Sequence, residues 1–220
     1  MVKMMGTLSS LRMIAAILAA ALISTVVAQP GRPSLPDLID QSASRYNLSM
    51  YVEMLRSSSE ALRTLEMQRS AGGGLTVLAP TNEVVAACLH RLSSCLSGQE
   101  MEQVMTMNLK YCALPGRFEE ADLRLSIQQS GGQIHLPALR GGSHQLAVSE
   151  GPSKYASAQR GLFVDNAQVL PDGFHVVSTP HVIVHVIDKS VVAPDVRAMI
   201  NKYCPTPAES APSPSRVPGS

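Results

Sequence analysis

The histidines of this sequence are spaced in a way that argues against a metal site. His181 and His185 are four residues apart, the spacing at which two imidazoles on one helix can bind the same ion. The segment around them contains VIVHVI, which predicts a strand, and in a strand four residues span about 13 Å. No C-x-x-C or H-E-x-x-H motif occurs. We therefore expect no metal ion and interpret His185 as a buried, hydrogen-bonded residue.

Cys112 is the residue best suited to nucleophilic catalysis. It follows a predicted helix and could meet a histidine in space, the arrangement that activates a thiol. A place in a disulfide bond is the competing interpretation. No G-x-S-x-G motif is present, and the glycine-rich segments 72–74 and 141–142 lack the lysine of a phosphate-binding loop. We expect no cofactor and no enzymatic activity; a secreted enzyme that uses the Cys112 thiol with a histidine is the alternative.

The first 28 residues have the three-part pattern of a secretory signal. Lys3 and Arg12 precede residues 13–27, which carry no charge, and Val26 and Ala28 place small side chains where a signal peptidase cleaves. A membrane anchor is the alternative, but a spanning helix needs about 20 apolar residues. We expect cleavage after residue 28 and a secreted, extracellular protein without a stable membrane anchor.

An even number of cysteines in an exported chain predicts two disulfide bonds. The candidates are Cys88, Cys95, Cys112 and Cys204. On one continuous helix Cys88 and Cys95 would lie roughly 10 Å apart, too far for a bond, whereas a helix that ends near Leu92 would let them pair. We favour Cys88–Cys95 with Cys112–Cys204, but the sequence leaves all three pairings open.

Composition excludes some classes of protein. The 220 residues include 18 Lys and Arg against 17 Asp and Glu, so the chain lacks the basic surface of a nucleic-acid-binding protein. A hydrophobic content of 45% is enough for a core. We expect a proline-containing lead-in over residues 29–36 and one domain over residues 37–200.

Apolar residues at helical spacing predict helices in the first half of the chain. Two stripes contain methionine, within residues 48–55 and 101–109, and Asn82 is placed to cap a helix between them. Methionine can line a ligand groove, but it also fills irregular gaps in a core, and we interpret both stripes as core. A small-ligand carrier with a methionine-lined pocket is a third hypothesis.

Strand patterns dominate the second half. Residues 75–79 and 182–187 are continuously apolar and predict buried strands, the latter a central one. Asp165-Asn166 is a plausible hairpin turn. Further short strands are predicted over residues 123–127, 134–136, 145–149, 162–164 and 167–170. Helices followed by antiparallel strands indicate an α+β fold.

Two features suit an extracellular chain. Asn47-Leu48-Ser49 is a glycosylation sequon that we expect to be exposed near a helix start. The segment 205–220 is rich in proline, serine and alanine and has no Leu, Ile or Phe. It is either an O-glycosylated stalk or a plain disordered tail.

Three segments, in matching order and spacing, resemble the fasciclin domain. Residues 76–85 (TVLAPTNEVV) resemble its first box, residues 111–117 (YCALPGR) its middle motif, and residues 185–189 (HVIDK) its second box. The resemblance spans about residues 35–195. It implies one α+β domain, a β-wedge or sandwich of short, mostly antiparallel strands with helices grouped in the N-terminal half. The signal and the tail are similar to those of secreted fasciclin-like arabinogalactan proteins of plants.

The resemblance also implies a function and roles for residues. It implies a non-catalytic role in cell adhesion, or in the extracellular matrix or cell wall, with matrix or wall polysaccharides or proteins as partners. Thr81 and Asn82 would hold the first box to its helix, and His185 and Asp188 would anchor the second. The adhesion surface would lie around Tyr111 and Cys112, where Cys112 replaces the usual histidine.

Overall fold

The computed structural model describes residues 32–43, 45–157 and 159–204, and the fold lies in the unit that begins at Ser34. The predicted signal and tail lie outside the described residues. The α+β class is confirmed. The elements are α2 (Leu35–Ala43), α3 (Ser49–Ser57), α4 (Ser59–Ser70), β1 (Leu75–Pro80), α5 (Asn82–Ser93), α6 (Gly98–Tyr111), β2 (Ala113–Pro115), α7 (Glu120–Gln129), β3 (Gln133–Pro137), β4 (Gln145–Pro152), β5 (Arg160–Val164), β6 (Ala167–Gln168), the 3-10 turn η1 (Pro171–Gly173), β7 (Val177–Thr179), β8 (Val182–Ile187) and α8 (Pro194–Tyr203).

The first sheet is built around the two continuously apolar strands. Its order is β2-β1-β8-β7, and β1 runs parallel to β8 from the pair Leu75 and Val182 to the pair Pro80 and Ile187. All six residues of β1 and all six of β8 are buried, as expected for strands covered on both faces. The prediction of a central strand at 182–187 is therefore confirmed.

The second sheet is antiparallel, in the order β3-β4-β5-β6. The predicted turn at Asp165-Asn166 joins β5 to β6, where Val164 pairs with Ala167. Asp165 has a φ of 52°, the left-handed conformation that a two-residue hairpin turn requires. The two sheets meet where Val169 forms a bridge with Ile187 of β8.

The segment 120–129 is a helix, so the strand predicted over residues 123–127 is wrong. Leu123 and Ile127 are four residues apart and both are buried, whereas Leu125 between them is 55% exposed. Leu123 and Ile127 fit both a two-residue and a helical period, whereas Leu125 fits only the two-residue period. Glu120 and Asp122 favour the helix because acidic side chains in a first turn interact well with the helix dipole.

The ends of the fold also differ from the predicted boundaries. Leu35 and Pro36 are helical and buried, so the folded unit includes the end of the expected lead-in. After β8 the chain forms α8, which was not predicted. Pro194 suits the first turn of this helix because that turn has N–H groups without helical partners, and Val196 and Ile200 form its buried face.

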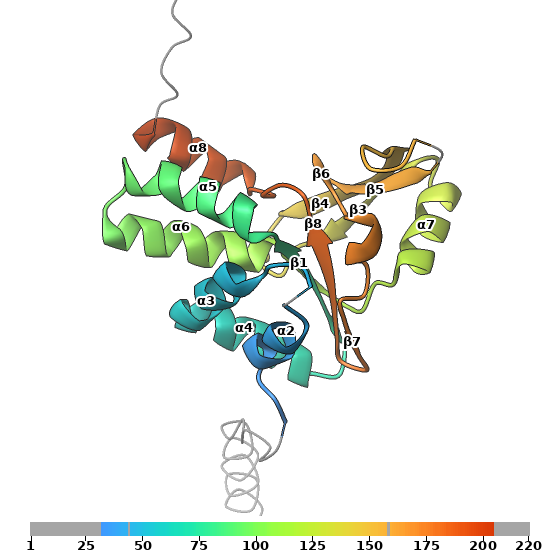
Figure 1. Ribbon diagram of the computed structural model, residues 1–220, viewed down its shortest axis with the longest axis horizontal. Helices are drawn as coiled ribbons and strands as arrows, with labels where there is room; N and C mark the ends of the chain where they lie inside the picture. Colours follow the sequence, from blue (N-terminus) through green and yellow to red (C-terminus); the bar gives the residue numbers. More distant parts are fainter. Residues whose placement is uncertain (1–31, 44, 158, 205–220) are drawn as a thin grey trace, which may run out of the picture. The chain divides into compact units, whose positions relative to one another are not determined.

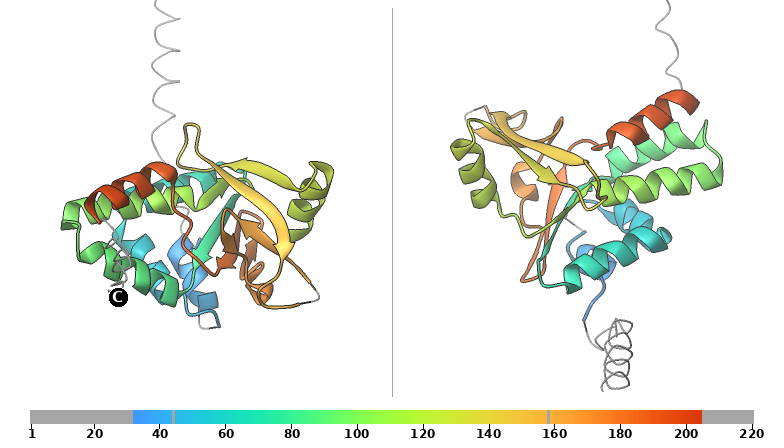
Figure 2. Two further views of the ribbon diagram at one scale, coloured as in Figure 1. Left: turned by 90° about the horizontal axis from the view of Figure 1, so that it is seen from above. Right: turned by 180° about the vertical axis from the view of Figure 1, so that it is seen from behind.

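Two apolar clusters fill the space around the first sheet. One joins α2, α3 and α4 to β1 and β8, and the other joins α5, α6 and α8 to the second sheet. In Figures 1 and 2, α5, α6 and α8 lie together on one side of β1 and β8, and the second sheet with α7 lies on the other. Five of the seven described α-helices come before residue 112, which agrees with the expected grouping.

Candidate functional site

The junction between α6 and β2 carries the two residues expected to form an adhesion surface. A capping box formed by Ser97 and Glu100 begins α6, and Tyr111 and Cys112 end it. The N–H of Leu78 in β1 donates to the carbonyl oxygen of Cys112 (2.9 Å), so the helix end is joined to the first sheet. The junction therefore lies inside the fold.

Tyr111 connects α6 to the second sheet. Its hydroxyl donates to the carbonyl oxygen of Gln145 (3.1 Å) and to Asp165 Oδ2 (3.2 Å). The N–H of Ala147 donates to the other carboxylate oxygen of Asp165 (3.0 Å). Burial and the neighbouring carboxylate raise the pKa of Tyr111. These contacts make Tyr111 a structural residue.

Cys112 is buried at the same junction. Its thiol donates to the carbonyl oxygen of Val191 (3.4 Å), and burial raises its pKa to about 12. Tyr111 and Cys112 are only 2% and 3% exposed. Both side chains are therefore too buried to provide contact area themselves, and an adhesion surface around them would have to be formed by exposed neighbours. A buried, protonated thiol is also a poor nucleophile.

The disulfide bond in the structure joins Cys95 to Cys204, and Cys88 and Cys112 are free. The favoured pairing, Cys88–Cys95 with Cys112–Cys204, is therefore wrong. Helix α5 continues to Ser93, which keeps Cys88 on the helix, and Cys95 follows its end. Burial raises the pKa of the Cys88 thiol.

The first-box residues connect the helices around β1. Thr81, and not Asn82, is the N-cap of α5, and its carbonyl oxygen accepts from the N–H of Val85 (3.0 Å). Asn82 accepts from the N–H of Met50 in α3 (2.8 Å). Its side-chain amide donates to Asn47 Oδ1 (2.8 Å). The prediction that Asn82 caps its own helix is wrong, because its side chain binds the start of α3 instead.

The second-box residues connect β8 to the segment before α7 and to β6 of the second sheet. His185 is 1% exposed, and its Nε2 donates to the carbonyl oxygen of Phe118 (2.9 Å). Asp188 accepts from the N–H of Gln168 (2.7 Å) and from Lys154 Nζ (2.7 Å). His181 precedes β8 and is exposed. Within the described residues, no three or more His, Cys, Asp or Glu side chains are grouped to hold a metal ion.

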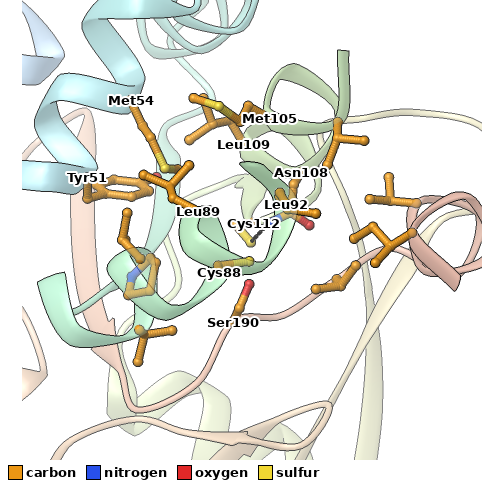
Figure 3. Close-up of a pocket in the computed structure, with 17 residues that line it drawn as sticks. Tyr51, Met54, Cys88, Leu89, Leu92, Met105, Asn108, Leu109, Cys112 and Ser190 are labelled. Carbon is orange, nitrogen blue, oxygen red and sulfur yellow. Dashed lines mark hydrogen bonds between the residues drawn. The ribbon is translucent and has the colours of Figure 1, made fainter. Parts of the chain in front are cut away.

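Two polar residues beside Cys112 were not singled out from the sequence as site residues. Tyr51 of α3 and Asn108 of α6 line a pocket together with Cys88 and Cys112 (Figure 3). Tyr51 belongs to the apolar stripe within residues 48–55, which was interpreted as core. Asn108 lies four residues after Val104, on the helix face that carries the second methionine stripe. A polar residue in an apolar stripe is the signal that could have identified it.

Asn47 is exposed, as expected, with a φ of 54° just before α3. None of the described helices has the length and apolar character needed to cross a membrane.

Comparisons with known proteins identify the family and the fold. The family model of the fasciclin domain matches residues 46–193. A comparison with curated proteins gives no match. Among solved structures, a FAS1 domain pair from the insect cell adhesion molecule fasciclin I is similar, with 16% identity and a TM-score of 0.50. The match covers 67% of this chain and 45% of that chain, so this chain spans less than half of that structure.

Proposed function

Because the chain belongs to the fasciclin domain family, we propose that it is a secreted, non-catalytic protein of cell adhesion or of the extracellular matrix or cell wall. The match over residues 46–193 carries this proposal. It includes all three boxes, which lie within one folded unit. The partner that we propose is a polysaccharide or protein of the matrix or wall.

The geometry of Cys112 supports a non-catalytic role. The alternative function, a thiol enzyme, needs an accessible thiolate with a base beside it. Cys112 instead donates to a backbone carbonyl oxygen, is 3% exposed and has a pKa of about 12. The alternative therefore lacks its nucleophile.

The contacts of an adhesion protein must come from exposed side chains, and the outer face of the second sheet provides them. Gln133 and His135 on β3 are exposed, whereas Ile134 between them is half-buried. Gln133 pairs with Ser149, which pairs with Phe163, so these side chains share one face. A face with amide, imidazole and aromatic groups offers several weak contacts, and their combined strength increases when many copies are presented together.

A binding experiment with the full chain tests the proposal. Purified protein, as monomer and as multimer on beads, is applied to immobilised matrix proteins and wall polysaccharides. We expect measurable retention of the multimer. The double variant Gln133→Ala, His135→Ala should weaken it about fivefold or more, because each lost hydrogen bond contributes about 0.5 to 1.5 kcal/mol.

The matched control is the double variant Gln99→Ala, Gln103→Ala, which changes two exposed residues on α6. It should bind like the unchanged protein. Failure of the multimer to bind any matrix or wall component would contradict the proposed function.

A further inference from the structure

A pocket lies between α3, α5, α6 and the segment that leads from β8 into α8 (Figure 3). Its cavity volume is about 40 Å³. One water molecule needs about 10 to 15 Å³ of such volume, so the pocket has room for about three water-sized groups. The pocket is therefore larger than a packing defect.

Two polar atoms in this pocket have no hydrogen-bond partner among the described residues. They are the Tyr51 hydroxyl and Asn108 Oδ1, and both are fully buried. Tyr51 is 1% exposed, and Figure 3 shows its ring reaching from α3 into the group of lining side chains. The Asn108 amide nitrogen lies 3.9 Å from Cys112 Sγ, which orients its oxygen away from that contact. Buried polar groups nearly always have hydrogen-bond partners. These two atoms therefore indicate that a bound molecule that would serve as their partner is missing.

The rest of the lining defines what that partner can be. Of the seventeen lining residues none is Lys, Arg, Asp, Glu or His. Burial of an unpaired charge is very costly, so a charged molecule is excluded. The apolar members are Met54, Pro80, Val84, Val85, Leu89, Leu92, Val104, Met105, Leu109, Val192, Val196 and Ile200.

The pocket can be reached from solvent. Met54, Leu89 and Met105 are only partly buried, whereas Tyr51 and Leu109 at the inner end are fully buried. Methionine side chains are flexible and adapt to different guests. Movement of Met54 and Met105 would enlarge the space beyond its present volume.

We propose that this pocket binds a small, uncharged, mainly apolar molecule that carries a hydroxyl group. A hydroxyl group beside Tyr51 can accept a hydrogen bond from the Tyr51 hydroxyl group, and Asn108 Oδ1, which only accepts, can take a separate donor such as an ordered water molecule. An aromatic or aliphatic body fills the apolar remainder, where methionine sulfur makes favourable contacts with rings. This site is separate from the outer face of the second sheet, and it adds a ligand-binding function to the adhesion function.

The experiment compares phenol with benzene, which differ only in the hydroxyl group. Binding to the full chain is followed by NMR titration of the amide signals of Asn108 and Cys112. We expect saturable shifts and a phenol affinity about threefold to tenfold above that of benzene, the contribution of one hydrogen bond. Benzoate, which adds a charge to the same ring, should not bind.

Two variants with controls test the site. Tyr51→Phe keeps the ring and removes the hydroxyl, so it should abolish the preference for phenol. Cys88→Phe should fill the pocket and weaken both probes, while the control Cys88→Ser should not. A pocket that holds only ordered water would bind neither probe. That result, or a phenol preference that survives in Tyr51→Phe, would overturn the proposal.

Discussion

His185 shows how a single residue in this fold depends on its surroundings. It lies in β8 with both ring nitrogens engaged: the N–H of His175 donates to Nδ1 (3.4 Å), and Nε2 donates to Phe118 O (2.9 Å). This arrangement requires the neutral ring. Burial, with a smaller contribution from nearby His175, lowers its pKa from 6.5 to about 4, although the hydrogen bond to Phe118 and the charge of Glu120 act in the opposite direction.

We predict that His185 makes the protein less stable in acid. Its pKa is lower in the folded than in the unfolded chain, so the unfolded chain takes up the proton first as the pH falls below about 6.5. Stability should therefore fall between pH 6.5 and 4 and stay unaffected above that window. The change in the pKa of His185 from 6.5 to about 4 corresponds to a loss of about 3 kcal/mol in the free energy of unfolding. Urea unfolding at several pH values between 4 and 8 measures this loss of stability.

The variant His185→Gln isolates this contribution. Glutamine can donate to the Phe118 carbonyl oxygen but does not titrate, so its free energy of unfolding should change less between pH 6.5 and 4. The exposed His181→Gln is the control and should keep the pH dependence of the unchanged protein. Equal slopes for His185→Gln and the unchanged protein would disprove the assignment.

Among the helices, α8 is held by contacts that are distant in sequence. The disulfide bond joins Cys204, directly after α8, to Cys95, two residues after the end of α5, across a sequence separation of 109. Arg91 donates to the carbonyl oxygen of Cys204 (3.4 Å), and Arg140 forms an ion pair with Asp195 in the first turn of α8. These contacts hold the helix against α5 and against the segment between β3 and β4.

Replacement of both bonded cysteines, Cys95→Ser with Cys204→Ser, should lower the free energy of unfolding by about 2 to 5 kcal/mol, because the unfolded chain regains the freedom of a long loop. Denaturant unfolding with and without a reducing agent measures this. The reducing agent should destabilise the unchanged protein and leave the double variant unaffected. Cys88→Ser, which removes a free thiol, should have a smaller effect. A reductant-insensitive unchanged protein would show that the bond does not form.

For the whole molecule, the exposed loop before α3 and the proposed secretion can be tested together. Asn47 Oδ1 accepts from Asn82, and the residue remains exposed, so the loop is ordered and accessible. Expression in a secreting eukaryotic host should give a chain that begins at Gln29 and carries a glycan at Asn47.

Intact-mass analysis before and after glycosidase treatment checks both points. Asn47→Gln should remove the added mass without changing the N-terminus. Labelling of thiols before reduction should modify at most Cys88 and Cys112, because Cys95 and Cys204 are bonded. A retained N-terminus would contradict secretion.

Local patterns alone predicted much of this protein. The buried strands β1 and β8, helices α3, α5 and α6, the hairpin at Asp165-Asn166 and the α+β class all follow from short-range periodicity and turn residues. Such signals depend on neighbours within a few positions, and burial of the apolar face supports the same conformation. The pattern was ambiguous over α7, because the four-residue spacing of Leu123 and Ile127 fits both a strand and a helix.

Only the tertiary structure decided which distant residues meet. The partner of Cys95, the burial of Tyr111 and Cys112, the contact of Asn82 with α3 and the pocket beside Asn108 all depend on how α5, α6 and α8 pack around the first sheet. The residue type determines which hydrogen bonds or disulfide bonds a side chain can form, but the packing of the elements determines which partner is close enough. For that reason the sequence could indicate the family and the elements, while the site residues had to be located in the fold.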